Sequence, residues 1–98
     1  MYVGALELDL MFGDVHSLKE KRSLLRPLIA ELRRRFDVAV AEAGHAELHR
    51  RALIGVAAVA GDVGHVQEVL QACERLVAGR PEVALLAARH RLLGPDDD

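Results

Sequence analysis

Residues 5–20 read ALELDLMFGDVHSLKE, a stretch that contains a strand, a break and the start of a helix in succession. Leucines at alternate positions are separated by acidic residues, which is the period of a strand with one buried face. A Gly-Asp pair interrupts that pattern. Ser17 followed three residues later by Glu20 is a capping box, the signature of a helix N-terminus. The stretch therefore predicts a strand over residues 2–12 and a helix that begins at Ser17.

The helix that begins at Ser17 is expected to run to about Phe36. Its apolar side chains form one stripe roughly 100° wide, which indicates that it packs on another element. They are Leu18, Leu25, Leu28, Ile29, Leu32 and Phe36. Pro27 removes a backbone hydrogen bond inside this helix, so the sequence predicts either a kink or two shorter helices.

The rest of the chain adds three strands and a second helix. The predicted strands are 37–42, 51–60 and 82–93, and the predicted helix is 63–78. The order β-α-β-β-α-β indicates a ferredoxin-like α+β fold, with two helices on one face of a four-stranded antiparallel sheet. Strands one and three are expected in its centre. We expect a single domain over residues 1–93 and an acidic, disordered tail over residues 94–98.

The composition restricts the class of protein. The chain has 98 residues, of which 51% are hydrophobic and 29% charged, and a formal charge of -2. These values are typical of a globular domain and exclude a wholly basic nucleic-acid binder. The single cysteine, Cys73, excludes an internal disulfide and a cysteine-cluster metal site. With no apolar run of membrane-spanning length and no signal-peptide pattern, we expect a cytoplasmic protein without a membrane partner.

Three segments carry a resemblance to a known family. They are HSLKEKR at 16–22, LRRRFDVAVAE at 32–42 and VLQACE at 69–74. On these motifs the chain resembles the YlxP-like family of small bacterial proteins of unknown function, over nearly its whole length. The resemblance implies a ferredoxin-like, cytoplasmic protein, often encoded near translation-initiation and ribosome-maturation factors, which suggests work on RNA or the ribosome. The family usually has Trp where this chain has His49, so a stacking role there does not carry over.

The first helix is strongly basic although the chain is not. Residues 17–36 hold seven lysines and arginines against two glutamates, a net +5, so the remainder carries -7. On a helical wheel, four of these cations fall within about 60° and form a ridge roughly 21 Å long. They are Lys19, Arg22, Arg26 and Arg33. We expect them to contact the phosphates of a structured RNA, supported by Lys21, Arg34 and Arg35.

Other interpretations of the ridge stay open. It is also consistent with a solvated outer face of a covering helix, or with a surface for an acidic protein. Only Tyr2, Phe12 and Phe36 are aromatic, too few for a base-stacking sheet, so RNA would be bound through its backbone and shape. The alternative function is a homo-oligomeric module that binds a small ligand, or regulates, through the sheet face.

The start of the first helix is a candidate anion site. Helix N-termini carry free N–H groups, and His16, Ser17 and Lys19 surround this one. The simpler interpretation is an ordinary capping box. Lys21 lies near the apolar stripe, and we expect it to extend its ammonium group to solvent at the sheet edge.

No pattern of catalytic residues is present, so we expect no enzyme, cofactor or metal site. The histidines lack partners at ligand spacing, and Cys73 falls in the apolar stripe of the second helix. Glu7 and Asp9 alternate in step with Arg89 and Arg91 of the last strand. Cross-strand ion pairs account for these four residues.

The sheet face away from the helices is expected to be apolar, which favours a homodimer. Residues 51–60 carry apolar side chains on both faces, so one set stays uncovered whichever set faces the helices. The strand near residues 38–41 is an edge without Lys or Pro to block pairing. The candidate interface residues are Val38, Val40, Ile54 and Val56.

Overall fold

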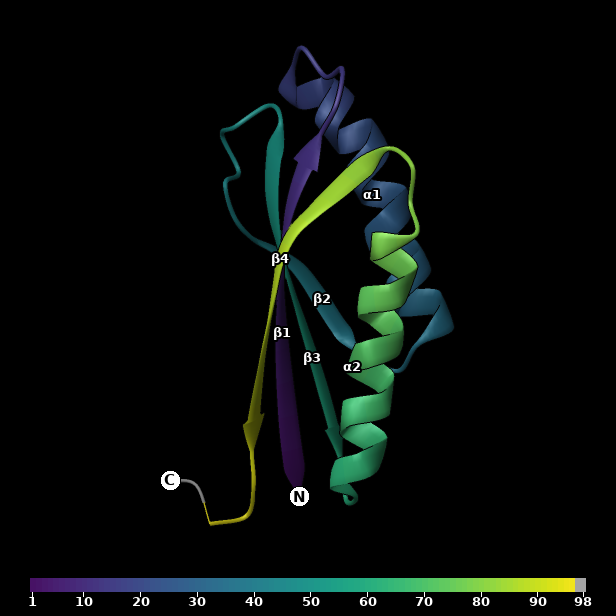
Figure 1. Cartoon of the computed structure of the whole chain (residues 1–98), viewed down its shortest axis with the longest axis vertical. Helices are drawn as coiled ribbons and strands as arrows, with labels where there is room; N and C mark the ends of the chain where they lie inside the picture. The colour runs from purple at the N-terminus through teal and green to yellow at the C-terminus, as the bar shows by residue number, and fades with distance from the viewer. Residues whose placement is uncertain (97–98) are drawn as a thin grey trace.

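The computed structural model describes residues 1–96, and its element order is the predicted β-α-β-β-α-β (Figure 1). The elements are β1 (Tyr2–Phe12), α1 (Leu18–Arg35), β2 (Ala39–Gly44), β3 (Arg51–Ala60), α2 (Val63–Ala78) and β4 (Val83–Leu93). The ferredoxin-like α+β fold is thereby confirmed. Residues 97 and 98 of the predicted acidic tail lie outside the described part of the chain.

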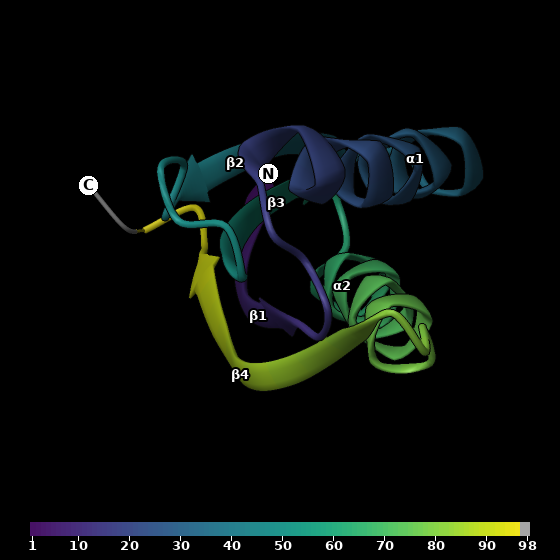
Figure 2. The ribbon, with the colours of Figure 1, turned by 90° about the horizontal axis from the view of Figure 1, so that it is seen from above.

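The four strands form one antiparallel sheet in the order β2-β3-β1-β4, so β1 and β3 are central as predicted. Both helices lie on the same side of this sheet (Figure 2). The sheet curves around α2, and α1 lies toward β2. We call the opposite side of the sheet, which neither helix covers, the open face.

The alternation of residues along the strands decides which side chains enter the core. β1 directs Leu6, Leu8 and its other even-numbered residues toward the helices, where both leucines are buried. In β3 their register partners are Val56 and Ile54, which therefore face the helices as well. The helices contribute the buried residues Leu25, Leu28 and Leu32 from α1 and Val66, Leu70, Cys73 and Val77 from α2.

The predicted boundaries agree with the structure to within about two residues. α1 is one helix through Pro27, so the alternative of two shorter helices is wrong. Pro27 is exposed, and water can bond the carbonyl that loses its donor. β2 begins at Ala39 rather than at residue 37, because Phe36 ends the helix and accepts a hydrogen bond from the N–H of Val38. In the described chain, neither helix is long and apolar enough to cross a membrane.

Candidate functional site

One side of α1 presents cations that nothing in the described chain neutralises. We call Lys19, Arg22, Arg26 and Arg33 the basic flank. Lys19 and Arg26 are exposed, and Arg22 is half-buried. Within residues 1–96, the side chains of these three make no hydrogen bond or ion pair. A polyanion would therefore meet charges that no carboxylate compensates.

Arg33 shows where the basic flank lies in the fold. Its guanidinium donates a hydrogen bond to the main-chain carbonyl of Val40 in β2. The flank therefore runs alongside the β2 edge of the sheet. The same bond occupies a carbonyl that an incoming strand would use, so the edge that the sequence left unprotected is partly blocked by Arg33.

The two arginines that follow differ from each other. Arg34 is exposed, and its side chain has no ion-pair partner in residues 1–96. Arg35 pairs with Glu31 at 3.2 Å, and its guanidinium lies 5.9 Å from the centre of the Phe36 ring. Glu31 also pairs with Arg80, in the connection between α2 and β4. Glu31 thus neutralises the side of α1 that faces away from the basic flank.

Lys21 is not a surface residue, which corrects both roles expected for it. Its side chain is 0% exposed, so it neither reaches phosphate nor extends into solvent. Its Nζ donates to the carbonyl oxygens of His45 at 3.0 Å, Ala46 at 3.3 Å and Arg51 at 3.2 Å. It also forms an ion pair with Glu42 at 3.3 Å. Lys21 thereby ties α1 to the β2–β3 connection.

The sequence contains a signal for this burial. Lys21, Leu25, Leu28 and Leu32 follow one another at spacings of four, three and four residues, which places them on one helix face. All four are buried. A lysine at such a position needs a buried set of acceptors, and here the turn at His45, with its positive φ of 58°, provides them.

The start of α1 is a satisfied cap. The Ser17 hydroxyl accepts from the N–H of Glu20 at 3.1 Å, and the Glu20 carboxylate accepts from the N–H of His16 at 3.2 Å. The His16 ring lies 2.7 Å from the Asp14 carboxylate. An anion beside His16, Ser17 and Lys19 would meet two carboxylates, so this geometry favours the ordinary cap over an anion site.

The acidic residues of β1 take different partners. Glu7 forms an ion pair at 3.6 Å with Arg89 of the neighbouring strand β4, as predicted. Asp9 instead pairs with Arg51 of β3, whose Nη2 lies 2.8 and 2.9 Å from the two carboxylate oxygens. The expected partner Arg91 lies opposite Ala5 in the register, too far along the strand to reach Asp9. The hydrogen bond from Arg51 lowers the pKa of Asp9 below its usual value of 3.8, against the opposing effect of burial.

The predicted oligomer interface is wrong in its choice of residues. Val40, Ile54 and Val56 belong to the core beneath the helices, and Val38 packs against that core. The apolar residues on the open face are the odd-numbered ones, such as Ala57 and the 61% exposed Val59. Both sets in β3 are apolar, so only the register with β1 distinguishes them.

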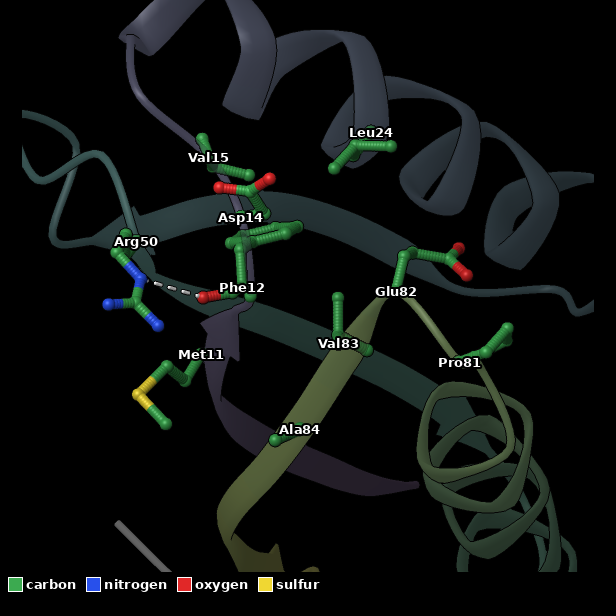
Figure 3. A pocket seen from close by; sticks show the side chains of 11 residues that line it. Met11, Phe12, Asp14, Val15, Leu24, Arg50, Pro81, Glu82, Val83 and Ala84 are labelled. Atoms are coloured by element: carbon green, nitrogen blue, oxygen red, sulfur yellow. Dashed lines mark hydrogen bonds between the residues drawn. The ribbon is translucent and has the colours of Figure 1, made fainter.

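A cavity of about 370 Å³ lies at the end of β1 (Figure 3). Phe12, Val15, Leu24 and Val83 form its apolar walls, and Arg50 at its mouth donates from Nε to the Phe12 carbonyl at 3.1 Å. The terminal nitrogens of Arg50 and the carboxylate of Glu82 point away from the apolar centre of the cavity (Figure 3). The walls come from separate segments that only the fold joins, and no polar groups converge there to hold a ligand.

The remaining titratable residues form no centre. In residues 1–96 there is no group of three or more His, Cys, Asp or Glu side chains placed to hold a metal ion. His90 lies 2.6 Å from Glu74, which joins β4 to α2. Cys73 is buried in α2, and burial raises the pKa of its thiol to about 11.

Comparison with known proteins identifies related sequences without assigning an activity. A family model described as "Protein of unknown function (DUF503)" matches residues 3–90. A protein of Bacillus subtilis (strain 168) named "Uncharacterized protein YlxP" is 28% identical over 81 residues. That match covers 83% of this chain and 88% of the Bacillus protein.

Proposed function

The chain belongs to the DUF503 family of unknown function, and we propose that it is a cytoplasmic, non-enzymatic module that binds structured RNA, as free RNA or within the ribosome. The basic flank of α1 would contact the phosphates. The observation that carries this proposal is the set of uncompensated cations Lys19, Arg22 and Arg26 on one side of one helix. The release of counterions from phosphates favours binding by cations that have no partner within the protein.

The geometry of the flank suits a polyanion better than a single anion. From Lys19 to Arg33 the helix rises about 21 Å at ~1.5 Å per residue, a span that meets several successive phosphates. Four phosphate contacts would lower the affinity roughly 50- to 150-fold between 50 and 200 mM salt.

Recognition in this proposal depends on backbone and shape. Phe12 is fully buried, and Phe36 and Tyr2 pack against the core. None of the three aromatic rings forms a platform for unstacked bases. The expected ligand is therefore a folded or double-stranded RNA, with weak preference for sequence.

Fluorescence anisotropy with a labelled RNA hairpin, recorded across a salt series, tests the proposal. The variant R22E/R26E removes two cations of the flank. Q67E/Q71E/R75E is its matched control, because Gln67, Gln71 and Arg75 are exposed on α2, away from both the basic flank and the open face, and the charge change is equal. We expect R22E/R26E to lose binding and the control to keep most of it. Equal losses in both, or no binding by the wild type, would contradict the proposal.

The alternative function is a homo-oligomeric module that binds a small ligand on the open face. A shallow apolar hollow of about 370 Å³ favours it, lined by Ala5, Ala39, Ala41, Gly55 and Ala57 among others. Thermal-shift screening with metabolites separates the two functions. A ligand that raises the melting temperature of wild type and R22E/R26E equally would support the alternative.

A further inference from the structure

The centre of the open face is built of small apolar residues. The strand registers place Ala39, Ala57 and Ala5 in one row across β2, β3 and β1. The next row contains Ala41 and Gly55, with Glu7 beside Gly55 on β1. The alanines and Gly55 form the floor of the shallow hollow described above, and Glu7 also lines it. Because the floor residues have no side-chain atom beyond Cβ, another surface can approach the strands closely there.

Most of the charged residues of the open face are neutralised within the face; the exception is Arg91, opposite Ala5 on the border strand β4, which has no ion-pair partner in residues 1–96. Glu7 pairs with Arg89, and Asp9 pairs with Arg51. Burying a charge that keeps its partner costs far less than burying a lone one. The open face therefore differs from the basic flank: all of its charges except Arg91 at the β4 border are paired and its centre is apolar, which suits a protein surface rather than a polyanion.

A large apolar side chain stands beside the hollow. Val59 follows Ala57 by two residues in β3, so both point to the open face, and Val59 is 61% exposed. A surface that carries a hollow and a neighbouring projection is suited to self-association, because a two-fold axis places each projection against the hollow of the other copy.

We propose that a second copy of this chain packs on the open face, with Val59 of each copy seated against Ala57 and Gly55 of the other. The strands, 6 to 11 residues long, offer about 600 Å² per copy at ~3.3 Å per residue and ~4.8 Å between strands. Two copies bury about 1,200 Å², the lower end of the range for stable, specific interfaces.

Pairing through the edge strand β2 is a poorer route to a dimer. β2 has only six residues, and its register shifts between Glu42 and Gly44. The Arg33 guanidinium occupies the Val40 carbonyl. Short length, irregularity and a blocked carbonyl all weaken strand addition. Face-to-face packing also leaves the helices on the outside, so the interface does not depend on RNA binding or cover the basic flank.

Light scattering after size-exclusion chromatography tests this interface at micromolar concentrations. The wild type is expected at twice the chain mass of 10.7 kDa. A57R and V59D place an unpaired charge in the interface and should raise the dimer dissociation constant about 100-fold or more. Both positions are exposed, so circular dichroism should show native folding.

L48D is the matched control, because Leu48 is a 48% exposed apolar residue outside the open face. It is expected to stay dimeric. A wild type that stays at the monomer mass of 10.7 kDa across this concentration range would overturn the proposal, and the open face would then be a surface for a different protein. Folded A57R and V59D that remain dimeric would overturn it as well, since the dimer would then use another surface.

Discussion

Lys21→Met is expected to lower the free energy of unfolding by about 3 kcal/mol. Methionine keeps the length and apolar stem of lysine but removes the ammonium group. Three carbonyl acceptors, at 3.0 to 3.3 Å, lose the ammonium donor, and of these the His45 carbonyl still accepts from the N–H of Leu48. Each buried acceptor left without a partner costs roughly 1 kcal/mol or more, and the carboxylate of Glu42 loses its cation. Removal of the buried charge itself offsets part of this loss.

Urea unfolding followed by far-ultraviolet circular dichroism measures this change. Lys19→Met is the matched control, since Lys19 is exposed and its side chain makes no hydrogen bond or ion pair in residues 1–96, and we expect a change within about 0.5 kcal/mol. The double variant K21M/E42Q should recover about 1 kcal/mol relative to K21M, because it removes the lone carboxylate.

A loss below about 1 kcal/mol for K21M would refute the reasoning, because the contacts of Lys21 would then contribute no more than ordinary surface contacts. A loss of about 3 kcal/mol that is unchanged in K21M/E42Q would locate the energy in the three carbonyls alone.

Three further changes follow from the packing and the ion pairs. Arg51 lowers the pKa of Asp9 in the folded state, so this pair stabilises the fold above pH 3.8 and loses its contribution as pH falls through the folded pKa. The variant D9N lacks this pair, and in urea titrations it should therefore lose less stability than the wild type between pH 7 and pH 3. Since burial raises the pKa of Cys73 to about 11, its reaction with a thiol reagent at pH 8 should be slow in the native protein and rise sharply in denaturing urea; rapid native labelling would contradict its burial. Gly4→Ala should destabilise the folded protein by about 1–3 kcal/mol in thermal unfolding, because the added Cβ would lie 2.5 Å from side-chain atoms of Leu70 and Val66. Gly61→Ala is the control, because a Cβ added there would have no atom within 4 Å.

Local patterns were sufficient for the order and bounds of the elements. The alternation in β1, the Ser17 cap and the apolar periodicity of α2 depend on residues a few positions apart, and the bounds of β3 and α2 agree with the prediction to the residue. The basic flank is likewise a property of one helix, so the sequence alone placed its cations together.

Partners that lie far apart in the sequence could not be predicted in this way. Lys21 finds its acceptors 24 to 30 residues away, and the partner of Asp9 is 42 residues away rather than on β4. The spacing of Lys21 with Leu25 and Leu28 places it on the buried face of α1, but it does not show which distant loop supplies the acceptors for the ammonium group.

The sequence by itself determined that this protein is a β-α-β-β-α-β domain with a basic first helix, because strand alternation, helix capping and helical charge clustering are short-range properties. The tertiary structure alone decided which face of β3 is open. Both of its faces are apolar, and the choice depends on its antiparallel register with β1, where Leu6 meets Val56 and Leu8 meets Ile54. A shift of one residue would exchange the two faces, so only pairing across the sheet could place Ala57 and Val59 outside.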